Sequence, residues 1–179
     1  MAQRNFDPRR LDVAAFAKEG ATLSGSWPVA ALPRLAESAA ARDTLGQVTF
    51  EARGERREEA GGAPQTWLHL KASARLPLAC QRCLEPVDVP LDVQQSLRFV
   101  AGENQAAELD ADSEYDVLAL TKSLDLQELV EDELLLALPL VPRHDVCPHP
   151  LPMAEHGATA EEREHPFAAL AALRGGKAR

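Results

Sequence analysis

Apolar residues alternate with polar ones on both sides of a short cysteine-containing segment, and this alternation constrains the fold more than any other feature. Over residues 67–78 the apolar side chains occupy even positions, whereas over residues 87–99 they occupy odd positions. Successive side chains of a strand point to opposite faces, so each pattern is typical of a strand with one buried face. Cys80 and Cys83 lie between the two patterns. The sequence therefore predicts a long antiparallel hairpin with two thiols at its tip.

Other elements are expected around this hairpin. The same alternation predicts strands over residues 21–29, 48–53 and 115–120, and apolar spacing predicts helices over residues 11–18, 33–41 and 125–138. Asp125 followed by Glu128 forms a capping box at the start of the last of these helices, and Pro139 ends it. Residues 101–113 are acidic and lack periodicity, so we expect a mobile loop there. The fold class expected is α+β, an antiparallel β-sheet with a long central hairpin and helices packed on one face.

The length of 179 residues suits one domain. We expect a single α+β domain over residues 1–150 and a C-terminal extension over residues 151–179, with a polar linker and a short apolar helix. No apolar run is long enough to cross a bilayer, and the N-terminus does not resemble a signal peptide. The three cysteines form an odd number, which argues for a reducing compartment. We therefore expect a cytoplasmic protein.

The net charge of −9 limits how this chain would bind a nucleic acid. Neutralising phosphates supplies most nonspecific affinity, so direct RNA binding needs a local basic face. Arg53, Arg75 and Arg82 are candidate RNA-binding residues, because neighbouring strands would place several such side chains on one exposed face. Ordinary solubilising charge explains them equally well, since acids are interleaved with them: Glu51, Glu55, Asp88 and Asp92.

The Cys80-x-x-Cys83 motif allows three interpretations. Its spacing lets two thiolates reach one zinc ion, and Cys147 with His144 or His149 would complete a tetrahedral site. A redox dithiol should open a helix, but here a strand is expected to follow. The third interpretation is that the thiols are half-buried turn residues. The candidate metal ligands are therefore Cys80, Cys83, Cys147 and His144, and Zn²⁺ is the cofactor considered.

Nothing in the sequence supports an enzyme. It contains neither a glycine-rich phosphate loop nor a G-x-S-x-G nucleophile motif. The run Glu131-Asp132-Glu133 lies on the predicted helix over residues 125–138, where a solvated acidic face explains it better than acid–base catalysis. We expect Glu128, Glu131 and Asp132 to face water.

Three blocks of this sequence closely resemble the YceD family. They are Cys80-Gln81-Arg82-Cys83-Leu84-Glu85-Pro86-Val87, then Leu129-Val130-Glu131-Asp132-Glu133-Leu134 continuing to Pro139 and His144-Asp145, and finally Pro166-Phe167-Ala168-Ala169-Leu170. The family comprises bacterial proteins associated with accumulation of large-subunit (23S) ribosomal RNA. The resemblance implies a non-enzymatic factor in the synthesis, processing or stability of that RNA, and hence in ribosome biogenesis. Many members carry a second cysteine pair after the helix, where this chain has Cys147 and histidines.

Two functions follow from the residues and the resemblance together. In the first, the candidate arginines bind precursor ribosomal RNA or a large-subunit assembly intermediate. In the second, the protein is an acidic adaptor or chaperone for a basic ribosomal protein. Its partner-binding candidates are the acidic residues 103–116 and the helix positions Glu128, Glu131 and Asp132.

Overall fold

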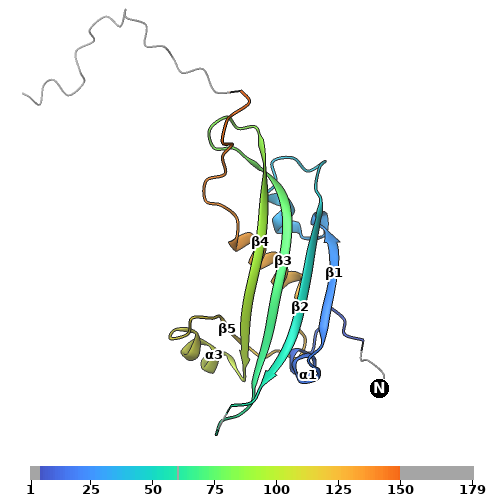
Figure 1. Cartoon of the computed structure of the whole chain (residues 1–179), viewed down its shortest axis with the longest axis vertical. Coiled ribbons are helices and arrows are strands. Elements are labelled where there is room, and N and C mark those ends of the chain that lie inside the picture. Colours follow the sequence, from blue (N-terminus) through green and yellow to red (C-terminus); the bar gives the residue numbers. More distant parts are fainter. Residues whose placement is uncertain (1–4, 60, 150–179) are drawn as a thin grey trace, which may run out of the picture. The chain divides into compact units, whose positions relative to one another are not determined.

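The computed structural model describes residues 5–59 and 61–149 (Figure 1). Its five-stranded sheet has the order β1-β2-β3-β4-β5 and is antiparallel except for the β4–β5 pair. In chain order the elements are α1 (Val13–Glu19), β1 (Thr22–Pro28), the short 3₁₀ helix η1 (Val29–Ala31), α2 (Pro33–Glu37), β2 (Gln47–Arg57), β3 (Gln65–Ala79), β4 (Pro86–Val100), α3 (Glu103–Asp110), β5 (Val117–Ala119) and α4 (Leu126–Leu136). The predicted α+β class is confirmed.

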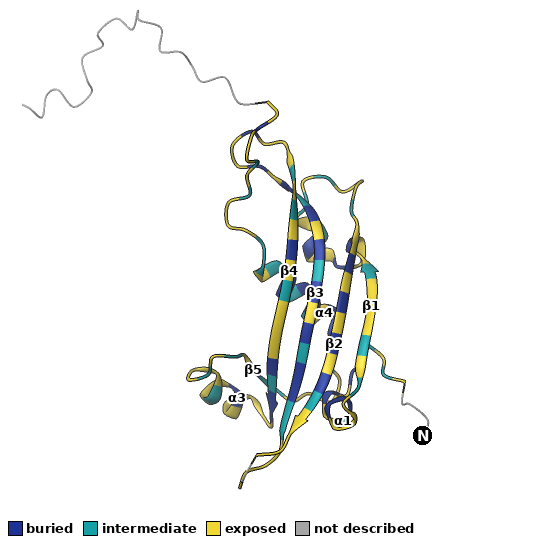
Figure 2. Cartoon of the chain, viewed as in Figure 1, coloured by how far each residue is buried: buried dark blue, intermediate teal, exposed yellow. Residues whose placement is uncertain are grey.

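The long hairpin of β3 and β4 is the centre of the sheet. Each strand has 15 residues, and they pair in register from Thr66 opposite Phe99 to Ala79 opposite Pro86. Even positions of β3 are buried, and the odd positions of β4 turn to the same side (Figure 2). The alternation in the sequence therefore identified both the strands and their buried face.

Three helices cover that buried face. Residues of α1, α2 and α4 share one hydrophobic core with β2, β3 and β4. In α4, Leu126, Val130 and Leu134 are fully buried at helical spacing. Asp125 caps α4, because its carboxylate accepts hydrogen bonds from the amides of Gln127 and Glu128 at 2.9 and 3.2 Å.

The packing of α1 against β2 depends on Gly54. A Cβ atom at this position would lie 2.7 Å from backbone atoms of Phe16 and Ala17 in α1. Glycine therefore permits the close approach of helix and strand. Gly20 ends α1 with a φ of 59°, in the left-handed conformation expected of this residue.

Glu131 does not face water, and this expectation was wrong. Its side chain is only 5% exposed. One carboxylate oxygen accepts hydrogen bonds from the backbone amides of Arg34 and Leu35, at 2.7 and 3.1 Å, and the other binds the Arg34 guanidinium at 3.0 Å. Because the first amides of a helix lack partners within the helix, the carboxylate caps α2 from another element. Glu131 is therefore not part of an exposed partner-binding surface.

The expected mobile loop over residues 101–113 contains α3, so that prediction was also wrong. Ala106 of α3 is buried in a small cluster with Val100 and Val117 at the end of the sheet. The Asp110 carboxylate accepts a hydrogen bond from the Val117 amide at 2.9 Å. Only a few apolar side chains hold α3, which is why the sequence shows almost no helical periodicity there.

Two helices end earlier than expected, α2 at Glu37 and α4 at Leu136. None of the described helices is long and apolar enough to span a membrane. The predicted apolar helix of the C-terminal extension lies outside the described residues.

Candidate metal centre

The tip of the hairpin is a tight turn that presents Cys80 and Cys83 on one side. The Leu84 amide donates to the Cys80 carbonyl at 2.9 Å, and the Cys80 amide donates to the Glu85 carbonyl at 3.0 Å. Leu84 adopts a φ of 65°, which turns the chain back into β4. No helix follows Cys83, so the turn lacks the helix N-terminus that activates a redox dithiol.

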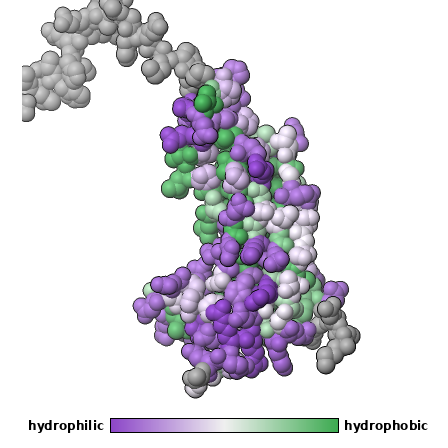
Figure 3. Space-filling model, viewed as in Figure 1, coloured by the Kyte–Doolittle hydropathy of each residue, from purple (hydrophilic) through white to green (hydrophobic). Residues whose placement is uncertain are grey.

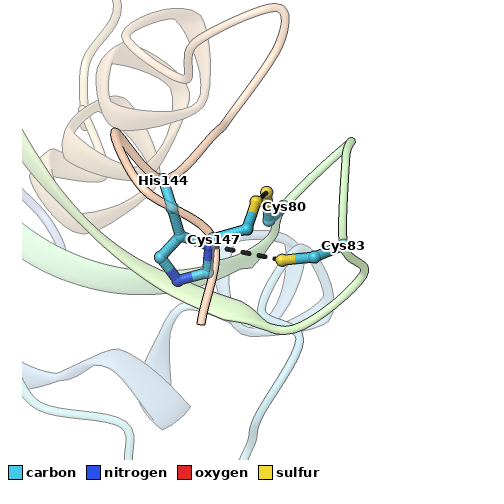
Figure 4. Close-up of side chains that lie close together, drawn as sticks. All are labelled: Cys80, Cys83, His144 and Cys147. Atoms are coloured by element: carbon cyan, nitrogen blue, oxygen red, sulfur yellow. Dashed lines mark hydrogen bonds between the residues drawn. The ribbon is translucent and has the colours of Figure 1, made fainter. Parts of the chain in front are cut away.

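The chain beyond α4 packs against this turn. The Gln81 amide donates to the Pro142 carbonyl at 2.9 Å, and this contact brings His144 and Cys147 to the hairpin tip. One ligand atom from each of Cys80, Cys83, His144 and Cys147 lies within 4.8 Å of the others (Figure 4). The three cysteines are buried, and none forms a disulfide. The structure therefore brings all four candidate metal ligands together.

The spacing of these atoms suits a tetrahedral ion. Zn–S bonds of about 2.3 Å and Zn–N bonds of about 2.0–2.1 Å place neighbouring ligand atoms roughly 3.5–3.8 Å apart. The Cys80 and Cys147 sulfurs are 3.9 Å apart, and the Cys83 sulfur lies 3.4 Å from His144 Nδ1. The set of three sulfurs and one imidazole nitrogen is a common structural zinc site. The cluster can hold a metal ion.

His144 is oriented for this role by a backbone carbonyl. Its Nε2 lies 3.1 Å from the Pro86 carbonyl oxygen, which only accepts hydrogen bonds. Nε2 must therefore carry the proton, and Nδ1 keeps a lone pair directed toward the sulfurs. His149 is not part of the cluster, although the sequence alone did not distinguish it from His144.

Arg82 supplies positive charge beside the sulfurs. Its Nε donates to the Cys147 sulfur at 2.9 Å, and one Nη donates to the carbonyls of His144 and Asp145 at 3.1 and 3.3 Å. Three thiolates around a divalent ion would carry one net negative charge, which the Arg82 guanidinium would offset. Arg82 thus lies within the candidate metal centre.

The thiols differ in acidity. Burial acts to raise the pKa of Cys80, but the backbone amides of His144, Arg82 and Cys83 outweigh it and lower that pKa to about 5. Burial, with the neighbouring thiols Cys147 and Cys80, raises the pKa of Cys83 to about 11. The pocket therefore favours the thiolate of Cys80 and disfavours that of Cys83.

Arg53 and Arg75 lie on the other face of the sheet, opposite the helices. Arg53 pairs with His69 in the β2–β3 register, and Arg75 is six positions further along β3, so they are about 20 Å apart. Both form exposed ion pairs, Arg53 with Glu55 at 3.4 Å and Arg75 with Asp88 at 2.9 Å. The three candidate arginines therefore do not converge on one point.

The remaining acidic candidates stay on the surface of α4. Glu128 is exposed, whereas Asp132 is half-buried and pairs with Arg34 at 2.5 Å. Asp132 is thus already partnered within the chain, because the Arg34 side chain bridges both Glu131 and Asp132.

Fold and site together define a small α+β protein in which a Cys₃His cluster joins the tip of a long hairpin to the chain beyond an acidic helix. Residues 68–174 match the sequence model of the family described as large ribosomal RNA subunit accumulation protein YceD. A protein of that name from Haemophilus influenzae is 32% identical over 174 residues, which cover 93% of this chain and 95% of the relative. The chain belongs to the YceD family. No solved structure matches it.

Proposed function

We propose that the protein is a non-enzymatic, cytoplasmic ribosome-biogenesis factor that acts in the synthesis, processing or stability of 23S ribosomal RNA. It binds precursor RNA or a large-subunit assembly intermediate. The observation that carries this proposal is the similarity, over 93% of the chain, to a relative named for accumulation of the large ribosomal RNA. The family is likewise described as an accumulation factor.

The helix-free face of the sheet is the RNA-contacting surface we propose. It carries Arg53, Lys71 and Arg75, together with hydroxyl and amide side chains such as Ser73 and Gln94. Acids are interleaved with the bases, so the face is close to neutral although the whole chain has a net charge of −9. Such a face tolerates phosphates better than the acidic remainder of the surface.

Salt-dependent binding tests this surface. A double variant, Arg53→Ala with Arg75→Ala, should weaken binding to precursor 23S RNA fragments and reduce the slope of log affinity against log salt by roughly 1–2. The control removes the same charge elsewhere, through Arg42→Ala with Lys122→Ala, both outside the sheet. Equal loss in the two double variants would mean that net charge alone governs binding, and it would overturn the proposed surface.

The Cys₃His cluster would hold a structural zinc ion, in our proposal. The ion would fasten the chain beyond α4 to the hairpin tip, because its ligands come from both segments.

Co²⁺ added to metal-free protein should give thiolate charge-transfer and tetrahedral d–d absorption. Cys147→Ser should change that spectrum, and His149→Ala should not. A protein that purifies without zinc and shows no such absorption with Co²⁺ would contradict the proposal.

A second candidate function is an acidic adaptor for a basic ribosomal protein. The net charge of −9 and the acids over residues 103–116 favour it. Pull-down from cells distinguishes the two functions, since recovery of a ribosomal protein after RNase treatment supports the adaptor. Recovery that RNase abolishes supports RNA binding.

A further inference from the structure

Most of strand β4 has no strand on its outer side. β4 pairs with β3 along nearly its whole length, from Pro86 to Phe99. On the other side, β5 pairs only with Arg98, Phe99 and Val100 (Figure 1). Residues 88–96 therefore form an open sheet edge in the described part of the chain.

The hydrogen bonds at the two ends of β4 show which backbone groups lie on this edge. The Arg98 amide donates to the Asp116 carbonyl at 3.0 Å, and the Val100 carbonyl accepts from the Leu120 amide at 2.7 Å. Even-numbered residues thus direct their backbone groups outward, whereas odd-numbered residues pair with β3. At the other end, His144 contacts the Pro86 carbonyl. Between these closed ends, the outward backbone groups belong to Asp88, Pro90, Asp92, Gln94 and Ser96.

An open edge of this length is a template for another strand, and natural proteins usually cover or protect it. Pro90 removes one amide donor, and Asp92 adds negative charge to the strand, whereas Asp88 is paired with Arg75 of β3 at 2.9 Å. A second copy of β4 would bring aspartates together, so these residues disfavour self-pairing. A strand carrying positive charge would not meet this repulsion.

Carboxylates other than the paired Asp88 also lie close to β4. Asp92, Asp116 and Glu133 form no ion pair among residues 5–59 and 61–149. Burial raises the pKa of Glu133, and the nearby charge of Asp116 raises it further. Glu133 contacts Gln95 of β4 but is only 7% exposed, so this carboxylate lies on the helix-covered side of the sheet rather than on the open edge. Lysine or arginine side chains of an added strand would offset the exposed charges of Asp92 and Asp116.

A groove of mixed lining continues the edge toward the hairpin tip. It lies between the start of β4 and the chain beyond α4, where valines such as Val87, Val89 and Val141 alternate with the charged residues Asp88, Arg143 and Asp145. Other apolar side chains of this region are exposed to solvent, with Leu136 80% and Leu140 99% accessible. Apolar surface is visible along this side of the molecule in Figure 3. Such a groove suits the alternate apolar side chains of an extended segment.

We propose that the open edge of β4, residues 88–96, binds an extended segment of a basic protein as an additional strand. Main-chain hydrogen bonds to Asp92, Gln94 and Ser96 would provide affinity, while the exposed carboxylates and the valines of the groove would select alternating basic and apolar side chains. The inference goes beyond RNA contact and gives the adaptor function a defined surface. It does not require the helix-free face to bind RNA. An experiment can therefore disprove strand addition at β4 without disproving RNA binding, and the reverse also holds.

The probe is a fluorescent peptide of four Lys-Val repeats, titrated into the full-length protein. We expect saturable binding that weakens at least tenfold when alternate peptide amides are N-methylated, because methylation blocks strand pairing and leaves the charge unchanged. A Glu-Val peptide of the same length should not bind. Equal affinity of the methylated and unmethylated Lys-Val peptides would mean that charge attraction alone explains binding, and it would overturn the proposal. Absence of binding would also overturn it.

Amide hydrogen exchange locates the contact. Peptide binding should slow exchange at Asp92, Gln94 and Ser96, and leave Val93 and Gln95, which already pair with β3, nearly unchanged. Gln94→Pro removes an outward amide and should weaken peptide binding about tenfold while the melting temperature stays close to wild type. Slower exchange only at amides elsewhere in the sheet would contradict the proposed strand addition. Displacement of the peptide by RNA without any change in exchange at Asp92, Gln94 and Ser96 would contradict it as well.

Discussion

Arg82 of the hairpin tip and Cys147 beyond α4 form a direct contact, with Nε 2.9 Å from the sulfur. The two residues are 65 positions apart in the chain, and the contact joins the only two described segments that supply ligands to the cluster. An arginine that the sequence suggested for RNA binding thus lies beside a sulfur of the candidate metal centre.

Replacing Arg82 should weaken metal binding. Arg82→Gln removes the cation beside the Cys147 sulfur, and loss of such a supporting contact typically costs about 10–100-fold in metal affinity. Competition with a chromophoric chelator measures the change. Arg75→Gln is the control, since it removes an arginine paired only with the exposed Asp88. Unaltered affinity in Arg82→Gln would separate Arg82 from the metal centre.

Replacing Glu131 should destabilise the fold. Glu131→Gln cannot accept four charge-assisted hydrogen bonds as the carboxylate does, so the free energy of unfolding should fall by about 2 kcal/mol. Glu128→Gln, on the exposed side of α4, should change it by less than about 0.5 kcal/mol. Urea denaturation of both variants checks the prediction. Similar midpoints would mean that α2 does not depend on the carboxylate.

A methyl group at position 54 should separate α1 from β2. Gly54→Ala places its Cβ 2.7 Å from backbone atoms of α1, so the backbone of the helix or the strand must shift. Overpacking of this kind costs about 1–3 kcal/mol. Gly46→Ala is a matched control, since a Cβ added at Gly46 would have no atom within 4 Å. Thermal melts should therefore show a clear loss for Gly54→Ala alone.

The ion pairs of Glu55 should make stability depend on acid pH. Hydrogen bonds from Arg57 and then His69 lower the pKa of Glu55 to about 2 from its ordinary value of 4.5. The Glu55 carboxylate binds a proton less readily in the native protein than in the unfolded chain. Its contribution to the free energy of unfolding is therefore present above pH 4.5 and is lost as pH falls toward 2. The stability difference between wild type and Glu55→Gln should therefore shrink over this range in urea titrations. A stability difference that stays constant from about pH 7 to about pH 2.5 would contradict this prediction. Glu51→Gln, on the same strand, serves as the control.

Local patterns were sufficient for the central hairpin and for the start of α4. Alternation along residues 67–78 and 87–99 located β3 and β4, because burial of one strand face imposes a period of two on the chain itself. Asp125 located the start of α4 for a similar reason, since a capping side chain acts on amides two or three residues away. These interactions lie within a few residues or repeat regularly along the chain.

Contacts between distant segments decided the rest. α3 is held by Val100 and Val117, Glu131 is buried by α2, and His144 is oriented by Pro86. The sequence by itself determined the hairpin, the fold class and the residue types available to a metal. Only the tertiary structure decided which histidine joins the cysteines, which acid is buried and which edge of the sheet stays open. These outcomes depend on contacts between side chains that are far apart in the sequence, and local residue spacing does not predict such contacts.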